Sequence, residues 1–162
     1  MREIICNTSP IQYLYQLRLL NVLKKLYSIV FIPEAVADEL NVGISIGAHV
    51  PDPSQIDWIK IKKVKEKSLL PLVTNLGKGE KEVIALGLES KKPLLILDDL
   101  HARRYASFLN LPITGTLGVL LKGKLSGHIN NVSEYIELLE AMNFRLAPKT
   151  KIYALKQANE WK

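Results

Sequence analysis

Short apolar runs alternate along the chain with longer stretches in which apolar residues return every third or fourth position. An unbroken run is typical of a buried strand, and the second pattern is typical of a helix with one buried face. Apolar runs predict strands at residues 2–6, 27–33, 93–97 and 111–116. Helical spacing and helix-start residues predict helices at 11–23, from Pro33 to about Leu40, and at 79–90, 100–109 and 132–142. Two or three C-terminal helices are expected to complete the chain.

Three other segments give weaker signals. Residues 58–65 alternate apolar and basic side chains, which predicts a strand with one face toward water. Residues 43–55 are rich in Gly, Pro, Ser and Asp, which indicates a loop or a short helix. At the start of the first helix, Ser9 is expected to act as the cap of a helix whose first residue is Pro10.

The alternation of strands and helices predicts an α/β fold with a mainly parallel sheet. The run 93–97 is apolar at successive positions, as in central strands that are buried on both faces. We therefore expect a three-layer α/β/α sandwich that forms a single domain over residues 1–162. Its core is expected at about 2–145, followed by a C-terminal helical extension at about 146–162.

Composition narrows the class of protein. The chain has 162 residues, of which 48% are hydrophobic and 23% charged, and this balance is that of a globular domain. No apolar run approaches the roughly 20 residues that span a bilayer, and the first residues do not resemble a signal peptide. The single cysteine, Cys6, excludes an intramolecular disulfide, so we expect a cytoplasmic protein without a membrane partner. The net charge of +6 is compatible with a polyanionic partner but does not establish one.

Polar residues follow two of the predicted strands directly. Ligands of open α/β sheets bind outside the carboxyl ends of the strands. Asn7 follows the first strand, where it is either a turn residue or an oxygen ligand of a hard cation. Asp98 and Asp99 follow the most apolar strand, and one of them is expected to cap the next helix. Two adjacent carboxylates repel each other, so we expect a cation or an arginine, Arg103 or Arg104, to neutralise them.

Two further carboxylates are candidates because of their positions on predicted helices. Glu80 shares a helical face with Val83 and Ile84, and a carboxylate on a buried face is costly unless it is paired or bound to a metal. The alternative is an acid in the first turn that complements the helix dipole. Glu82 points away from that face and is expected to be solvated. Glu39 borders the apolar stripe of the helix after Pro33, and its alternative is a surface salt bridge.

All of these candidates offer oxygen atoms, and they lack the cysteine and histidine ligands that zinc favours. Such a set suits Mg²⁺ or Mn²⁺. In proteins these ions commonly support phosphoryl transfer, where the metal activates water and neutralises developing charge.

Five motifs, in this order and spacing over about residues 4–145, resemble the PIN-domain superfamily, in a prokaryotic branch related to VapC-type toxins. They are NTSP at 7–10, IPEAV with EL at 32–40, GKGE with AL at 77–86, LDD with AR at 97–103, and GTLGVL at 115–120. The resemblance implies that Asn7 stands where most PIN nucleases have their first Asp. It likewise implies that Glu39, Glu80 and Asp99 occupy the later acidic positions, with Asp98 as neighbour or substitute.

The resemblance implies a Mg²⁺- or Mn²⁺-dependent endoribonuclease with RNA as substrate. Its catalytic residues would be Glu39, Glu80, Asp98 and Asp99, and its metal ligands Asn7, Glu39, Glu80 and Asp99. The supporting residues would be Thr116 and Ser9, and the substrate contacts Arg103 and Lys78. A basic patch, made of Lys60, Lys62, Lys63, Lys65 and Lys67, is either a solvated strand face or a path for an RNA backbone.

A toxin role, an antitoxin partner and a homodimer are the finer expectations. The alternative is a weakened or inactive PIN-like module that binds RNA or protein, because Asn7 removes one negative charge from the cluster.

Overall fold

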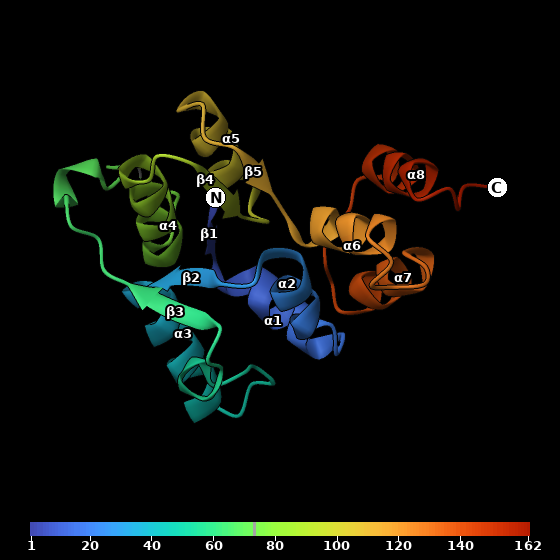
Figure 1. The fold of residues 1–162 in the computed structure, drawn as a ribbon, viewed down its shortest axis with the longest axis horizontal. Helices are drawn as coiled ribbons and strands as arrows, with labels where there is room; N and C mark the ends of the chain where they lie inside the picture. The colour runs from blue at the N-terminus through green and yellow to red at the C-terminus, as the bar shows by residue number, and fades with distance from the viewer. Residues whose placement is uncertain (73) are drawn as a thin grey trace.

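A computed structural model describes residues 1–72 and 74–162, and at its centre lies a five-stranded, entirely parallel sheet (Figure 1). The strand order is β3-β2-β1-β4-β5, so the chain moves outward from β1 on one side and then returns to β1's other side with β4. The strands are β1 (Glu3–Cys6), β2 (Val30–Pro33), β3 (Ile59–Lys62), β4 (Pro93–Ile96) and β5 (Ile113–Thr114).

The described residues form eight α-helices. They are α1 (Thr8–Gln16), α2 (Leu20–Tyr27), α3 (Glu34–Ser45), α4 (Lys78–Glu89), α5 (Leu100–Phe108), α6 (Thr116–Leu125), α7 (Ser133–Ala141) and α8 (Pro148–Gln157). Two short 3₁₀ helices, η1 (Pro53–Gln55) and η2 (Lys67–Leu69), lie in the connections around β3. None of these described helices has both the length and the apolar character needed to cross a membrane.

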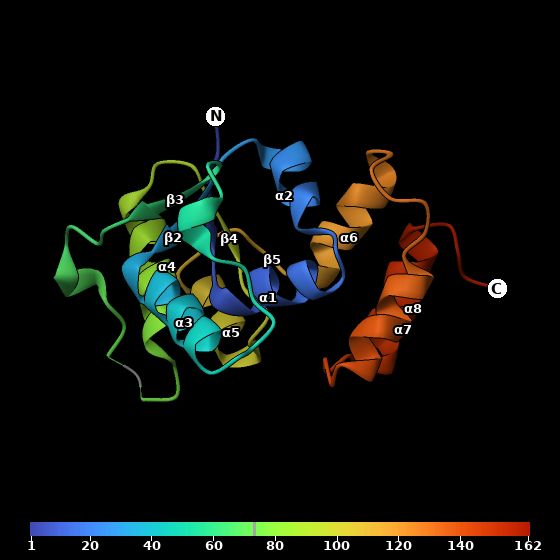
Figure 2. The same ribbon diagram turned by 90° about the horizontal axis from the view of Figure 1, so that it is seen from below.

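The sheet and helices share one core, and the expected three-layer α/β/α sandwich is confirmed. Helix α4 packs across β1, β2 and β4, whereas α2 and α3 pack on β2 and α5 packs on β5. Ile5 of β1 pairs with Leu95 of β4, and both side chains are fully buried, as expected for central strands. Helices α6, α7 and α8 gather to one side of the sheet in both views (Figures 1 and 2).

The predicted helix over 11–23 is two helices. Helix α1 ends at Gln16 and α2 begins at Leu20, and between them Arg18 adopts a left-handed backbone with φ of 61°. Leu14 and Leu23 on either side of this break are both fully buried. The apolar spacing therefore reports which side chains are buried, and it does not require an unbroken ladder of backbone hydrogen bonds.

The end of α3 and the exposure of β3 also differ from the predictions. Helix α3 continues to Ser45, into the segment expected to be a loop or a short helix. A Cβ at Gly43 would lie 3.0 Å from Val50 Cγ2, so the chain beyond the helix packs closely against this residue. Both faces of strand β3 are partly exposed to solvent. Ile61 is 56% exposed, although Ile59 on the same face is buried, because β3 is the edge strand of the sheet.

Candidate active site

The carboxyl ends of β1, β4 and β5 carry the polar residues that the sequence singles out. Asn7 follows β1, Asp98 and Asp99 follow β4, and Thr116 follows β5 as the first residue of α6. Because parallel neighbouring strands end at the same edge, these residues come together at one edge of the sheet. Helices α3 and α4 bring Glu39 and Glu80 to it.

Asn7 has a buried side chain with an unused acceptor. The residue is 6% exposed, and its Oδ1 atom is buried without a hydrogen-bond partner in the described part of the chain. It occupies the N-cap position of α1, yet its side chain makes no capping hydrogen bond. The turn interpretation therefore does not account for this side chain. Leaving a buried acceptor unpaired costs about 1–3 kcal/mol, which makes Oδ1 a candidate ligand atom.

Glu39 faces the same small space as Asn7, beside Gly79. A Cβ atom at Gly79 would lie 2.8 Å from Glu39 Oε1 and 3.1 Å from Asn7 Oδ1. The Gly79 backbone N–H donates to Glu39 Oε1 at 3.2 Å, and the Thr8 hydroxyl donates to Glu39 Oε2. The absence of a side chain at Gly79 thus leaves room between two oxygen atoms from different elements.

Glu80 lies in the first turn of α4 and is half-buried. Its Oε1 accepts a hydrogen bond of 2.7 Å from the Gly77 backbone N–H, so the first-turn alternative describes this contact. Burial is the main cause that raises the pKa of Glu80, and the Gly77 N–H opposes it. The negative charges of Asp99 and Glu39 raise the pKa of Glu80 further, which means that both carboxylates lie close enough to act on Glu80.

The two adjacent aspartates have different partners. Asp99 is the N-cap of α5, and its Oδ2 accepts from the Ala102 backbone N–H at 3.0 Å, which confirms that one of the pair caps this helix. Asp98 is directed toward α6 and α1. Its Oδ1 accepts from the Thr116 N–H at 2.7 Å, and its Oδ2 accepts from the hydroxyls of Thr116 at 2.6 Å and Ser9 at 3.1 Å.

Asp98 therefore joins α1, the end of β4 and α6, which fits a residue that positions the site. Burial raises the pKa of its carboxyl, while the hydrogen bonds from Thr116 and Ser9 and the charge of Arg103 lower it. This arrangement also corrects the expected role of Ser9. Helix α1 begins at Thr8, and the Ser9 hydroxyl donates to Asp98 and does not cap the helix.

The predicted substrate contacts occupy different environments. Arg103 is half-buried, and its Nη1 donates to the Leu97 carbonyl at 2.7 Å, which ties the guanidinium to the end of β4. Lys78 is the exposed first residue of α4, two residues before Glu80. Arg104 is exposed, so among the two arginines it is Arg103 that acts on the Asp98 carboxyl.

Glu82 contradicts its prediction. Its Oε1 accepts from the Ala35 backbone N–H at 3.0 Å, so it holds the first turn of α3, and it is not simply solvated. Glu82 thereby connects α4 to the helix that carries Glu39. Helical periodicity gives no signal for this contact, because the donor lies on a different element. The contact of Thr8 with Glu39 is hidden for the same reason.

The side chains at this edge fit a hard divalent cation in donor type. Asn7 Oδ1 and Glu39 Oε1 are oxygens that face a common space, and Glu80 and Asp99 add negative charge nearby. Over residues 1–72 and 74–162, however, no three Asp, Glu, His or Cys side chains converge as a ready-made metal site. Glu39, Glu80 and Asp99 each accept a backbone N–H instead. Asn7 and Glu39 are the two residues whose side-chain oxygens face one space, so these two could hold such an ion together.

Comparison with models of protein families matches residues 3–160 to a family described as a PIN domain. The match covers all five strands and all eight helices that the structure describes. A comparison with curated proteins finds no match.

Proposed function

The chain belongs to the PIN-domain family of the nuclease superfamily, and on this premise we propose that it is a divalent-metal-dependent endoribonuclease. Membership of this family supports assignment to the nucleases and a general dependence on divalent metal. The choice of RNA, the residues of the site and the toxin role are the finer parts of this proposal.

One observation carries the proposal for this particular chain. The unpartnered Oδ1 of Asn7 and the Oε1 of Glu39 lie 3.1 Å and 2.8 Å from the position that a Gly79 side chain would occupy. A buried acceptor without a donor, next to a carboxylate oxygen, is an unfavourable arrangement unless a cation approaches both.

We assign roles to the residues around this space. Asn7 and Glu39 would hold Mg²⁺ or Mn²⁺, and Glu80 and Asp99 would increase the affinity through their charge. When bound, such an ion activates water and neutralises the charge that develops on the phosphate. Lys78 is exposed at the start of α4, where it would contact a phosphate of the RNA. Asp98, with Ser9 and Thr116, would keep β4 and α6 in position.

A second candidate function is a binding module that retains the fold without the chemistry. It is favoured by the neutral side chain of Asn7 and by carboxylates that accept backbone N–H groups without converging. A toxin role with an antitoxin partner, and a homodimer, are further proposals. The exposed apolar side chains of Leu138 and Tyr153, on α7 and α8, offer a surface for such contacts.

The test is RNA cleavage with Mn²⁺ or Mg²⁺ and with EDTA, together with calorimetric titration of Mn²⁺. We expect metal-dependent cleavage that is lost in Glu39→Gln and in Asp99→Asn, a substitution that keeps a good helix cap. Asp38→Asn is the matched control, because Asp38 is an exposed neighbour on α3 with the same charge. Full cleavage by both site variants would overturn the assignment, and RNA binding without Mn²⁺ binding would favour the second function.

A further inference from the structure

A hollow lies at the opposite edge of the sheet from the carboxylates. The segments that precede β1, β4 and β5 form it, and these three strands are neighbours in the order of the sheet. Its volume is about 580 Å³, which is within the usual range for small-molecule sites. The Glu3 backbone N–H donates to the Lys92 carbonyl at 2.8 Å and so fixes the starts of β1 and β4 side by side.

Three cationic side chains, Arg2, Lys91 and Lys92, line this hollow, and no acidic residue does so among the described residues. None of the three forms an ion pair within the described part of the chain. The carboxylates that flank them in sequence are bonded elsewhere. Glu3 pairs with Lys62, and Glu89 accepts from the backbone N–H groups of Lys65 and Glu66. The hollow therefore keeps an uncompensated positive charge.

The dipole of helix α4 explains only part of the positive charge at this hollow. Lys91 and Lys92 follow the C-terminus of α4, where cations are favourable. Arg2 precedes a strand, so no helix end explains its place among the cations.

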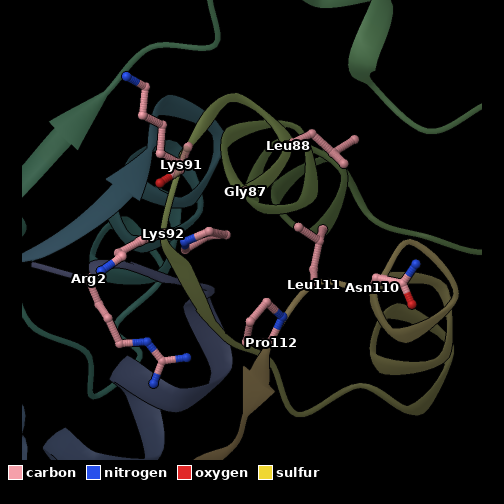
Figure 3. Close-up of a pocket in the computed structure, with 10 residues that line it drawn as sticks. Arg2, Gly87, Leu88, Lys91, Lys92, Asn110, Leu111 and Pro112 are labelled. Carbon is pink, nitrogen blue, oxygen red and sulfur yellow. The ribbon is translucent and has the colours of Figure 1, made fainter.

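Apolar and cationic groups occupy different sides of the hollow. In Figure 3 the side chains of Arg2, Lys91 and Lys92 lie on one side, with Lys91 and Arg2 extending in opposite directions, and those of Leu88, Leu111 and Pro112 lie on the other. A ligand that matches this division carries an anionic group at one end and a flat or apolar group at the other. A nucleotide has this chemistry, because its phosphate suits the cations and its base suits the apolar side.

We propose that the hollow lined by Arg2, Lys91 and Lys92 binds a nucleotide through its phosphate group. The nucleotide is either free in solution or one unit of an RNA strand. This site is separate from the proposed nuclease site, because it lies at the amino ends of the strands and uses none of the same residues.

The test uses the full chain in EDTA, so that RNA is not cut. One arm titrates AMP, with adenosine as the ligand that lacks phosphate, and the other measures anisotropy of a fluorescein-labelled single-stranded RNA over a range of salt concentrations. The variant carries Arg2→Gln, Lys91→Gln and Lys92→Gln. The matched control carries Arg145→Gln, Lys149→Gln and Lys156→Gln, which removes the same charges from exposed positions near α8.

We expect the variant that lacks Arg2, Lys91 and Lys92 to lose tenfold or more of its affinity for AMP or RNA, and the control variant to keep its affinity. If the wild type binds AMP and this variant does not, the ligand of the hollow is a free nucleotide. If AMP does not bind, RNA binding that weakens only in the first variant would identify RNA, and the salt slope should then be smaller by about 0.7 for each phosphate that the variant no longer neutralises. The proposal would be overturned if the variant and the control bound RNA and AMP with the same affinity, or if adenosine bound as tightly as AMP in a measurable titration.

The two proposals in this protein can be separated with Asp99→Asn. This change lies at the carboxylate edge, so it is expected to leave nucleotide binding at the hollow unchanged. Tighter AMP binding in Asp99→Asn, as expected where a carboxylate next to the bound phosphate loses its charge, would place that phosphate at the carboxylate edge and would overturn the site at the hollow. Thermal unfolding of the triple variant within a few degrees of the wild type is the control for folding.

Discussion

The carboxylate of Asp98 accepts both the hydroxyl and the backbone N–H of Thr116, at 2.6 Å and 2.7 Å. Thr116 is fully buried, so this pair fastens the start of α6 to the end of β4 away from solvent. Ser9 adds a third hydrogen bond from α1. The adjacent Asp99 is thereby left to cap α5 at the exposed side of the same turn.

Asp98 is expected to make stability depend on pH. Burial raises its pKa, so its contribution to stability is complete below the pKa of the unfolded chain and is lost as pH rises through the higher folded-state pKa. In Asp98→Asn the side chain does not titrate and can still bond Thr116 and Ser9. The free energy of unfolding of the wild type, relative to this variant, should decrease as pH rises above about 4, the ordinary pKa of an aspartate. Denaturant unfolding at several pH values measures it, and a constant difference would contradict the prediction.

Gly79→Ala should disrupt the space between Asn7 and Glu39. The new Cβ would lie 2.8 Å from Glu39 Oε1, so Glu39 must move. We expect Mn²⁺ affinity and cleavage to fall at least tenfold, while stability changes by about 1 kcal/mol or less, because Ala favours a helix. Gly123→Ala in α6 is the control, since its Cβ meets an apolar neighbour, Val22, at 3.1 Å. Unchanged Mn²⁺ titration in Gly79→Ala would show that the space is not used.

Glu82→Ala should weaken the site without removing a proposed ligand. It leaves the Ala35 N–H without its acceptor, which should lower the free energy of unfolding by about 1–2 kcal/mol. Because α3 carries Glu39, Mn²⁺ affinity should fall as well. Glu34→Gln, at the exposed start of α3, serves as the comparison. Equal metal affinity in both variants would limit Glu82 to a role in stability.

Asn7→Asp should have opposite effects with and without metal. A carboxylate at this buried position, close to Glu39, should lower stability in EDTA by roughly 1–3 kcal/mol. With Mn²⁺ the added charge should raise affinity and cleavage, since ligand charge tunes the affinity of oxygen sites for cations. Thermal unfolding with and without Mn²⁺ measures both effects. If Mn²⁺ did not restore the stability lost in EDTA, Asn7 would not be a ligand position.

The sequence predicts the edge of the sheet where the site lies, because polar residues after parallel strands meet at one edge. It therefore places Asn7 and the pair Asp98–Asp99 together. It does not predict which aspartate turns to α6, since that depends on the position of Thr116 after folding. The contacts of Glu82 with Ala35 and of Thr8 with Glu39 are hidden for a similar reason. Each joins segments 47 or 31 residues apart, beyond the reach of local pattern.

The strand order has a consequence for how the protein is made. Glu3 in β1 pairs with Pro93 in β4, so the centre of the sheet closes only after the chain has been synthesised beyond residue 96. Asn7 follows β1 and Asp99 follows β4, so the two residues come together only when these strands pair. A nascent chain still lacking β4 cannot assemble the carboxylate edge, and a ribosome carrying such a chain holds no completed form of the proposed nuclease site.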